Sequence, residues 1–556
     1  MHIRARLTPI RLCLALVGCL ILLPRRAPAA IRRAVTHHAV TRRSAAPTQI
    51  YSGVFTYHYD NARTGANPGE TTLKPANVNP ATFGKIASLP VDGYVYAQPL
   101  YVRNVRIPGK GVHNVVYAAT EHASVYAFDA DGRDPAPLWR RSFIAPEIGV
   151  TTVPSKATES PDLVPEVGIT STPVIDPSGT LYVVVKTDEQ GIFVQRLHAL
   201  DIATGQERPG SPRLIAPAVD GSGDGATENG FVPFNALREN QRSALAEING
   251  VIYIAFASHG DMPPFHGWVL GYDARTLELV DVFNNTPDGA DGGIWMGANG
   301  PAADAAGAIY VSAGNGTFDA DTGGRDYGDS AIKLAPATVN GRRQFRVADY
   351  FTPYDQRNLE KIDFDFGPSG PIVLPNQPTG PKHLLFVAGK EGTIYLLDRD
   401  NLGHYNPDDD SQIVQEVPGL LGMTYTPAAF FNNMFYFGPQ NRPLLAFPLV
   451  KGQISIDGEM AAGDPFGYPG VVPSVSANGR ADGIVWALQI DQYVSHGPAT
   501  LYAYDAATLN ELYDSRMEGP RDMAGPAVKF TTPMVADGRV YFGTQNSVDV
   551  FGLRGR

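Results

Sequence analysis

A paired motif of two short apolar strands recurs along the chain and constrains its fold more than any other feature. In the first pair, residues 116–120 (VYAAT) are followed by residues 125–129 (VYAFD). We count eight such pairs, whose first strands begin at residues 116, 181, 252, 309, 385, 435, 485 and 540. A unit of this size cannot bury both faces of its own sheet, so neighbouring units must pack against one another.

Further strands are expected on either side of each pair. Several pairs are preceded by a short Thr/Gln-Pro-apolar segment, as at residues 172–174 and 532–534, and several end in a turn such as residues 203–205 (ATG). Three or four strands per unit predict an all-β, eight-bladed β-propeller of four-stranded antiparallel blades, which we expect to be a monomer. The mean repeat of about 61 residues exceeds the roughly 40–50 residues of common propeller blades, so some blades carry long loops.

The N-terminus has the order of a secretory signal peptide. Basic residues precede the apolar run 12–23, and the small-residue sequence APAA ends at Ala30. This predicts a signal peptide over 1–30, a basic linker over 31–50 and one propeller domain over 51–556, with a periplasmic or secreted location. An uncleaved membrane anchor and a lipid anchor at Cys19 are the alternatives.

Cysteine content and charge exclude several functions. Both cysteines, Cys13 and Cys19, lie in the predicted signal peptide. The mature chain therefore has no disulfide, no Cys-ligated zinc and no covalently attached c-type haem. Residues 1–30 hold five of the 45 basic residues and none of the 56 acidic ones, which leaves a net charge of −16. An acidic body argues against nucleic acid as a partner.

Five segments resemble one known family. They are residues 59–65 (YDNARTG), 258–261 (SHGD, with HGWV at 266–269), 292–316 (GGIWMGANGPAADAAGAIYVSAGNG), 364–366 (FDF, with PIVL at 371–374) and 387–401 (VAGKEGTIYLLDRDN). These segments are similar to those of the quinoprotein alcohol dehydrogenases, which use pyrroloquinoline quinone (PQQ) and a calcium ion in an eight-bladed propeller. The resemblance implies an oxidoreductase that acts on an alcohol or a sugar.

The resemblance assigns roles to individual residues. Trp295 lies where the family stacks an indole on the quinone, and Lys390 where the family places a cation against the quinone oxygens. Asp261 and Asn315 occupy the positions of calcium ligands, and calcium prefers carboxylate and amide oxygens. Asp329 is the best match to the catalytic carboxylate, which would also reach the metal, with Asp326 as its competitor.

The chain also departs from the family. The adjacent-cysteine ring is absent, Thr317-Phe318 replace a tryptophan, and Glu391 replaces an asparagine. The haem carrier domain of some members is absent too. Two hypotheses therefore stand: a PQQ- and Ca²⁺-dependent dehydrogenase, or a non-catalytic, cofactor-free propeller that binds protein or cell-envelope partners. Fold alone does not decide between them.

Overall fold

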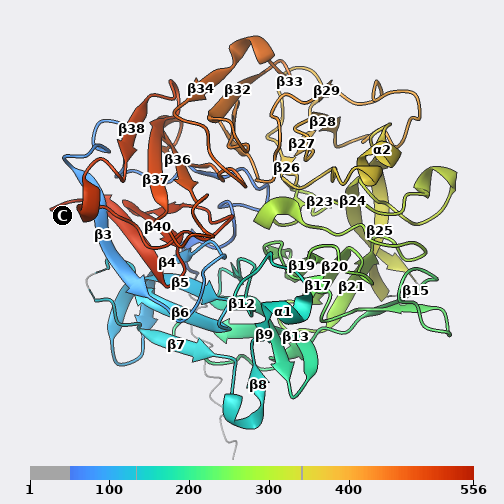
Figure 1. Ribbon diagram of the computed structural model, residues 1–556, viewed down its shortest axis with the longest axis horizontal. Coiled ribbons are helices and arrows are strands. Elements are labelled where there is room, and N and C mark those ends of the chain that lie inside the picture. The colour runs from blue at the N-terminus through green and yellow to red at the C-terminus, as the bar shows by residue number, and fades with distance from the viewer. Residues whose placement is uncertain (1–49, 133, 340–341, 556) are drawn as a thin grey trace, which may run out of the picture. The chain divides into compact units, whose positions relative to one another are not determined.

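Eight small β-sheets follow one another around a ring in the computed structural model, which describes residues 50–132, 134–339 and 342–555 (Figure 1). The fold is an all-β, eight-bladed propeller of mainly antiparallel sheets, as predicted. The predicted signal peptide and all of the predicted linker except Ile50 lie outside the described residues, so both stay predictions. No helix in the described part of the chain has the length and apolar character needed to cross a bilayer.

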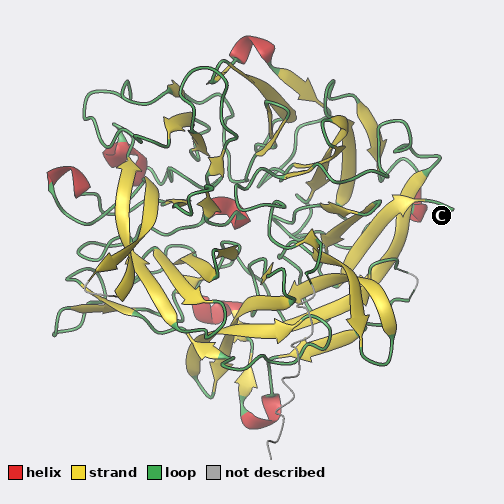
Figure 2. Ribbon diagram, turned by 180° about the vertical axis from the view of Figure 1, so that it is seen from behind, coloured by secondary structure: helices red, strands yellow, loops and turns green. Residues whose placement is uncertain are grey.

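Each blade has a core of four strands, and strands dominate the fold (Figure 2). The first four blades contain β4 (Leu100–Ile107), β5 (Gly111–Thr120), β6 (Ser124–Asp129) and β7 (Trp139–Ser142); β11 (Val174–Ile175), β12 (Thr180–Glu189), β13 (Ile192–Asp201) and β14 (Arg213–Leu214); β17 (Glu239–Asn240) and β18 (Ala246–Ile248) with β19 (Val251–Ser258), β20 (Trp268–Asp273) and β21 (Leu279–Asn284); and β22 (Ala302–Ala303), β23 (Ile309–Ser312), β24 (Ala331–Val339) and β25 (Arg342–Phe351).

The last four blades are built in the same way. They contain β26 (Ile372–Val373), β27 (Leu384–Ala388), β28 (Ile394–Asp398) and β29 (Gln415–Val417); β30 (Ala429–Phe431), β31 (Met434–Phe437), β32 (Leu444–Val450) and β33 (Gln453–Ile454), with β34 (Met460–Ala462) also on β32; β35 (Ser474–Asn478), β36 (Ala481–Gln489), β37 (Thr500–Asp505) and β38 (Glu511–Asp514); and β39 (Met534–Ala536), β40 (Arg539–Gly543), β41 (Ser547–Leu553) and β3 (Phe83–Pro90). The described helices are short and include α1 (Ser155–Thr158) and α2 (Gln356–Lys361).

The central strands are buried on both faces, which explains why the repeat lacks a polar alternation. All eight residues of β19 are buried. Each blade presses both faces on its neighbours: one apolar cluster joins Val115 and Ala127 of the first blade to Leu181 and Val183 of the second. A strand between two such interfaces needs apolar residues at every position.

The Asp that closes many second strands has a local role. In β20, Asp273 Oδ1 accepts hydrogen bonds from the backbone N–H groups of Arg275 (3.0 Å) and Thr276 (2.8 Å). Asp201 and Asp505 hold their following turns in the same manner. An Asp side chain that accepts from the next backbone groups forms an Asx turn, so these residues are structural.

The ring closes through its two ends. Strand β3, near the start of the chain, is the outer strand of the last blade and pairs antiparallel with β41, from Phe83 opposite Leu553 to Pro90 opposite Ser547. Figure 1 shows blue β3 beside the red strands of the C-terminal blade. Because the ring is closed, the first and last blades each pack against two neighbouring blades, as all the others do.

Candidate functional site

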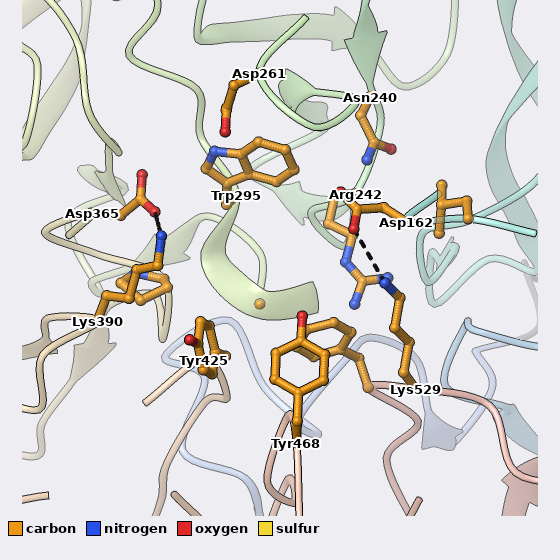
Figure 3. A pocket seen from close by; sticks show the side chains of 14 residues that line it. Asp162, Asn240, Arg242, Asp261, Trp295, Asp365, Lys390, Tyr425, Tyr468 and Lys529 are labelled. Carbon is orange, nitrogen blue, oxygen red and sulfur yellow. Dashed lines mark hydrogen bonds and ion pairs between the residues drawn. The ribbon is translucent and has the colours of Figure 1, made fainter. Parts of the chain in front are cut away.

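One pocket gathers residues from almost the whole ring. Its lining comes from the segments before β11, β18, β22, β26, β30, β35 and β39, together with the β19–β20 and β27–β28 loops. Segments that lead into successive blades meet only near the axis of a propeller. The pocket therefore lies where the family resemblance places a cofactor, and it contains Trp295, Lys390 and Asp261 (Figure 3).

Trp295 is held by a strained turn. The residues that follow it, Met296 (φ 49°), Gly297 (φ 53°) and Ala298 (φ 82°), all lie in the left-handed region. A Cβ at Gly297 would lie 2.5 Å from the carbonyl oxygen of Tyr425 and 2.6 Å from that of Pro368, so only glycine fits. Left-handed Met and Ala residues cost free energy and persist where the surroundings dictate them, often at functional sites. The half-buried indole is thus fixed with its ring on the pocket.

Lys390 is neutralised by two carboxylates. Its Nζ lies 3.1 Å from Asp363 Oδ1 and 3.1 Å from Asp365 Oδ2. Burial acts to lower the pKa of Lys390, and the charges of Asp365 and Asp363 outweigh it and raise that pKa. Asp365 has 18% of its side chain exposed, whereas Asp363 has 73% exposed, so Asp365 is the carboxylate within the pocket wall.

Asn315 forms a hydrogen bond with the carboxylate of Asp365. Its backbone N–H donates to Asp365 Oδ1 at 3.1 Å, and its Nδ2 donates to Asp329 Oδ2 at 3.4 Å. The Oδ1 atom of Asn315 is buried and has no hydrogen-bond partner among the described residues. A buried carbonyl oxygen without a partner is costly and calls for a donor or a cation. This orphan oxygen fits the predicted metal-ligating role of Asn315.

Asp329 lies deeper than the resemblance implied. It is fully buried, does not line the pocket, and accepts hydrogen bonds from Phe366 N–H (3.0 Å) and Gln356 Nε2 (3.3 Å). Burial and the negative charge of Asp365 raise the pKa of Asp329 well above its ordinary value. Its competitor Asp326 is also off the pocket, where it accepts from the backbone of Asp288. The catalytic role of Asp329 stays a prediction, and the structure offers Asp365 as the carboxylate that faces the pocket.

Asp261 reaches the pocket from the β19–β20 loop. It adopts a left-handed φ of 54° and is tied to Ser258, whose Oγ lies 3.1 Å from Asp261 Oδ1. Desolvation of the carboxylate and the charge of Asp365 raise the pKa of Asp261 to about 6, although the residue as a whole is exposed. Electrostatically, Asp365 therefore links Asp261 with Asp329.

Of the three predicted metal ligands, Asn315 and Asp329 are hydrogen-bonded to each other, whereas Asp261 is linked to them only through the charge of Asp365, so they form no finished site. Among the described residues, no three His, Cys, Asp or Glu side chains are arranged to hold a metal ion. The donor chemistry nevertheless fits calcium, because Asp261, Asp365 and the orphan Asn315 oxygen are hard oxygen donors. The ammonium group of Lys390 now sits on Asp365, so a cation would have to compete with it.

Sequence reasoning missed most residues of the pocket, among them the charged Asp365, Arg242 and Lys529. Asp365 lies in the segment 364–366, which resembles the family but was given no role in the site, and Arg242 and Lys529 belong to no motif. The available signal was their place in the repeat, since Arg242 and Lys529 both occur shortly before an innermost strand. Polar residues at that place point to the axis.

Solved structures share this architecture. The quinohemoprotein alcohol dehydrogenase from Comamonas testosteroni matches 91% of this chain and 81% of its own, with a TM-score of 0.58 and 15% identity. A europium-containing methanol dehydrogenase matches 90% of this chain and 98% of its own, with a TM-score of 0.57 and 15% identity.

This chain has the quinoprotein alcohol dehydrogenase fold. A quinohemoprotein alcohol dehydrogenase from Pseudomonas putida HK5 agrees, with a TM-score of 0.56 at 15% identity over 91% of this chain and 80% of its own. No protein-family model and no curated protein matches the sequence. The likeness is therefore one of fold, and the quinoprotein fold leaves activity to be argued from the site.

Proposed function

We propose that this protein is an exported PQQ- and metal-dependent dehydrogenase that oxidises an alcohol or a sugar. The observation that carries the proposal is the convergence of Trp295, Lys390, Asp261 and Asp365 on one axial pocket of the quinoprotein fold. The folds of known alcohol and methanol dehydrogenases support it.

In this proposal, different residues of the site bind the cofactor and the metal ion. Trp295 offers a flat indole face to a flat tricyclic acid. Lys390 offers an ammonium group to its oxygens. Asp261, Asp365 and the free Asn315 oxygen would hold the metal ion. PQQ, when bound, supplies the two-electron oxidising chemistry.

Asp365 is the base in this proposal. It faces the pocket, and its Oδ1 is fixed by the Asn315 N–H while Lys390 holds Oδ2. A carboxylate held in this way accepts the hydroxyl proton of an alcohol that lies in the pocket. Asp329 instead fixes the segment of Phe366 from the interior.

A reconstitution experiment tests the proposal. PQQ is added to the purified protein with Ca²⁺, and in a parallel sample with Eu³⁺, because one structural neighbour is a europium-containing enzyme. We expect a higher melting temperature, quinone absorbance that stays with the protein, and dye reduction with an alcohol. If none of the three effects is seen with Ca²⁺ or with Eu³⁺, the proposal fails and the cofactor-free binding propeller becomes the better hypothesis.

Two isosteric variants then separate the carboxylates. Asp365→Asn should abolish dye reduction, and Asp329→Asn should retain most of it, with circular dichroism as the check on folding. The opposite result would return the catalytic role to Asp329. N-terminal sequencing of the mature protein tests export, with a new terminus expected after Ala30.

A further inference from the structure

Two cations lie at the side of the pocket away from Lys390. Figure 3 shows Lys390 and Asp365 at one side of the pocket and Arg242, Lys529 and Asp162 at the other. The first side is rich in carboxylates, since Asp363 and Asp365 both pair with Lys390. The second side has two cations: Asp162 pairs with Lys529, and the buried carboxylate of Glu121 acts on Arg242 through its charge.

Arg242 is a buried cation that is attracted by the charges of Glu121 and Asp162. The residue is 6% exposed, and its Nη2 atom has no hydrogen-bond partner among the described residues. The guanidinium group packs over the ring of Phe530, 4.5 Å from the ring centroid, and 5.8 Å from that of Tyr96. Aromatic faces offset a part of the desolvation cost of a buried cation. They leave the N–H groups of its Nη2 atom unsatisfied, which is expensive inside a protein.

Lys529 is only weakly paired. Its side chain is 7% exposed, and its Nζ lies 3.4 Å from Asp162 Oδ1, a carboxylate with 43% of its side chain exposed. Between the two cations stands Phe530, which has a left-handed φ of 64°. That conformation is rare for a bulky residue and is kept where the surroundings over-determine it. The backbone therefore holds Lys529 and the Phe530 ring in fixed positions against Arg242.

We propose that Arg242 and Lys529 form a carboxylate-binding subsite of the axial pocket. A carboxylate accepts two N–H bonds from a guanidinium group in a planar fork, and a lysine adds a point charge. It would satisfy the free Nη2 atom of Arg242. The proposal extends the proposed function, because the carboxylate belongs either to PQQ or to an acidic substrate such as a hydroxy acid.

Binding of acids and their esters tests the subsite. The dissociation constants of PQQ and PQQ trimethyl ester are measured by calorimetry for the wild type, Arg242→Gln and Lys529→Gln. The exposed residue Arg213 on β14 supplies the control variant Arg213→Gln. We expect Arg242→Gln to weaken PQQ binding about 10- to 100-fold, which is the loss of one charge-assisted hydrogen-bond pair. Binding of the ester should change little, and Arg242→Lys should restore a part of the affinity.

A melting curve without ligand separates this role from a structural one. Removal of a buried cation whose Nη2 atom makes no hydrogen bond should leave the melting temperature of Arg242→Gln unchanged or raise it. A guanidinium group that served only to stabilise the fold would lower it on removal.

The source of the carboxylate is decided by a second measurement. If PQQ binds equally to the wild type and to Arg242→Gln, the carboxylate belongs to the substrate. The KM of the PQQ-loaded variant for glycerate should then be higher than that of the wild type, whereas the KM for glycerol should be the same in both. If the wild type binds no PQQ, the proposed function fails, and the subsite is still tested by benzene-1,3,5-tricarboxylate, which should raise the melting temperature of the wild type only. Equal behaviour of wild type, Arg242→Gln and Lys529→Gln toward all three acids would overturn the proposal.

Discussion

Replacement of Gly314 by alanine should weaken metal binding at the site while sparing the fold. A Cβ at this position would lie 2.4 Å from Asp365 Oδ1 and 3.2 Å from Trp295 Cδ1. The Asp365 carboxylate must therefore move and lose its hydrogen bond from the Asn315 N–H, now 3.1 Å long. Gly314 does not lie in the left-handed region, so the backbone itself tolerates alanine.

The magnitude follows from that hydrogen bond. A bond to a charged acceptor contributes about 1.5–3 kcal/mol, and a Gly→Ala change at a compatible position returns about 0.4–1 kcal/mol. Net destabilisation of about 1–2 kcal/mol corresponds to only about 1–2 °C in melting temperature, because the unfolding entropy of a 556-residue chain is about 1 kcal/mol/K. The same loss at the metal ligand lowers metal affinity roughly 5- to 30-fold.

Calorimetric titration of the PQQ-loaded protein with Ca²⁺ measures this affinity, and differential scanning calorimetry measures the melting temperature. Gly69→Ala is the control, since the one atom that its Cβ would meet is Asn67 Oδ1 at 3.2 Å. Metal affinity of Gly314→Ala equal to that of wild type would refute the role of Asp365 and Asn315 as a fixed pair.

Three further predictions concern other residues. The pKa of Asp261 is raised to about 6, so most of this carboxyl group is still protonated at pH 5. Its ionisation should therefore strengthen Ca²⁺ binding between pH 5 and 7. Calorimetric titrations with Ca²⁺ over this pH range should show the rise in affinity for the wild type and a smaller rise for Asp261→Asn. Trp295→Ala should weaken PQQ binding about 10-fold while Trp295→Phe keeps most of it, as read by retained quinone absorbance, and equal binding would contradict the stacking role. Trp486→Ala should cost about 3–5 kcal/mol of unfolding free energy in denaturant titrations, since this fully buried indole fills the interface between the last two blades.

The sequence predicted the fold well because the repeat encodes it directly. All eight predicted pairs coincide with central strands, as residues 252–256 do with β19 and residues 540–544 do, to within one residue, with β40. Burial on both faces leaves a continuous apolar run that is visible without any structure. The closing role of β3 was not predicted, because its partner β41 is more than 450 residues away in the chain.

The site was only partly predictable. Trp295, Lys390 and Asp261 were found through the family resemblance, and they do line one pocket. Whether Asp329 or Asp365 faces that pocket depends on how the loops before β24 and β26 fold, and neither spacing nor composition carries that information. Arg242 could not be predicted either, because what marks it as a candidate is the missing hydrogen-bond partner of its Nη2 atom, which only the folded structure reveals.

Ring closure by β3 and completion of the pocket involve the same blade. Lys529 and Phe530 lead directly into β39, the innermost strand of the blade that β3 finishes. The pocket therefore has no complete wall until Lys529 and Phe530 have been synthesised and the last blade has taken its place in the ring, which the pairing of β41 with β3 completes. Pairing over so long a loop is slow, and its entropic cost grows with the logarithm of loop length. A ligand that binds the finished pocket favours the closed ring by mass action, so ligand supply during folding should raise the yield of native protein.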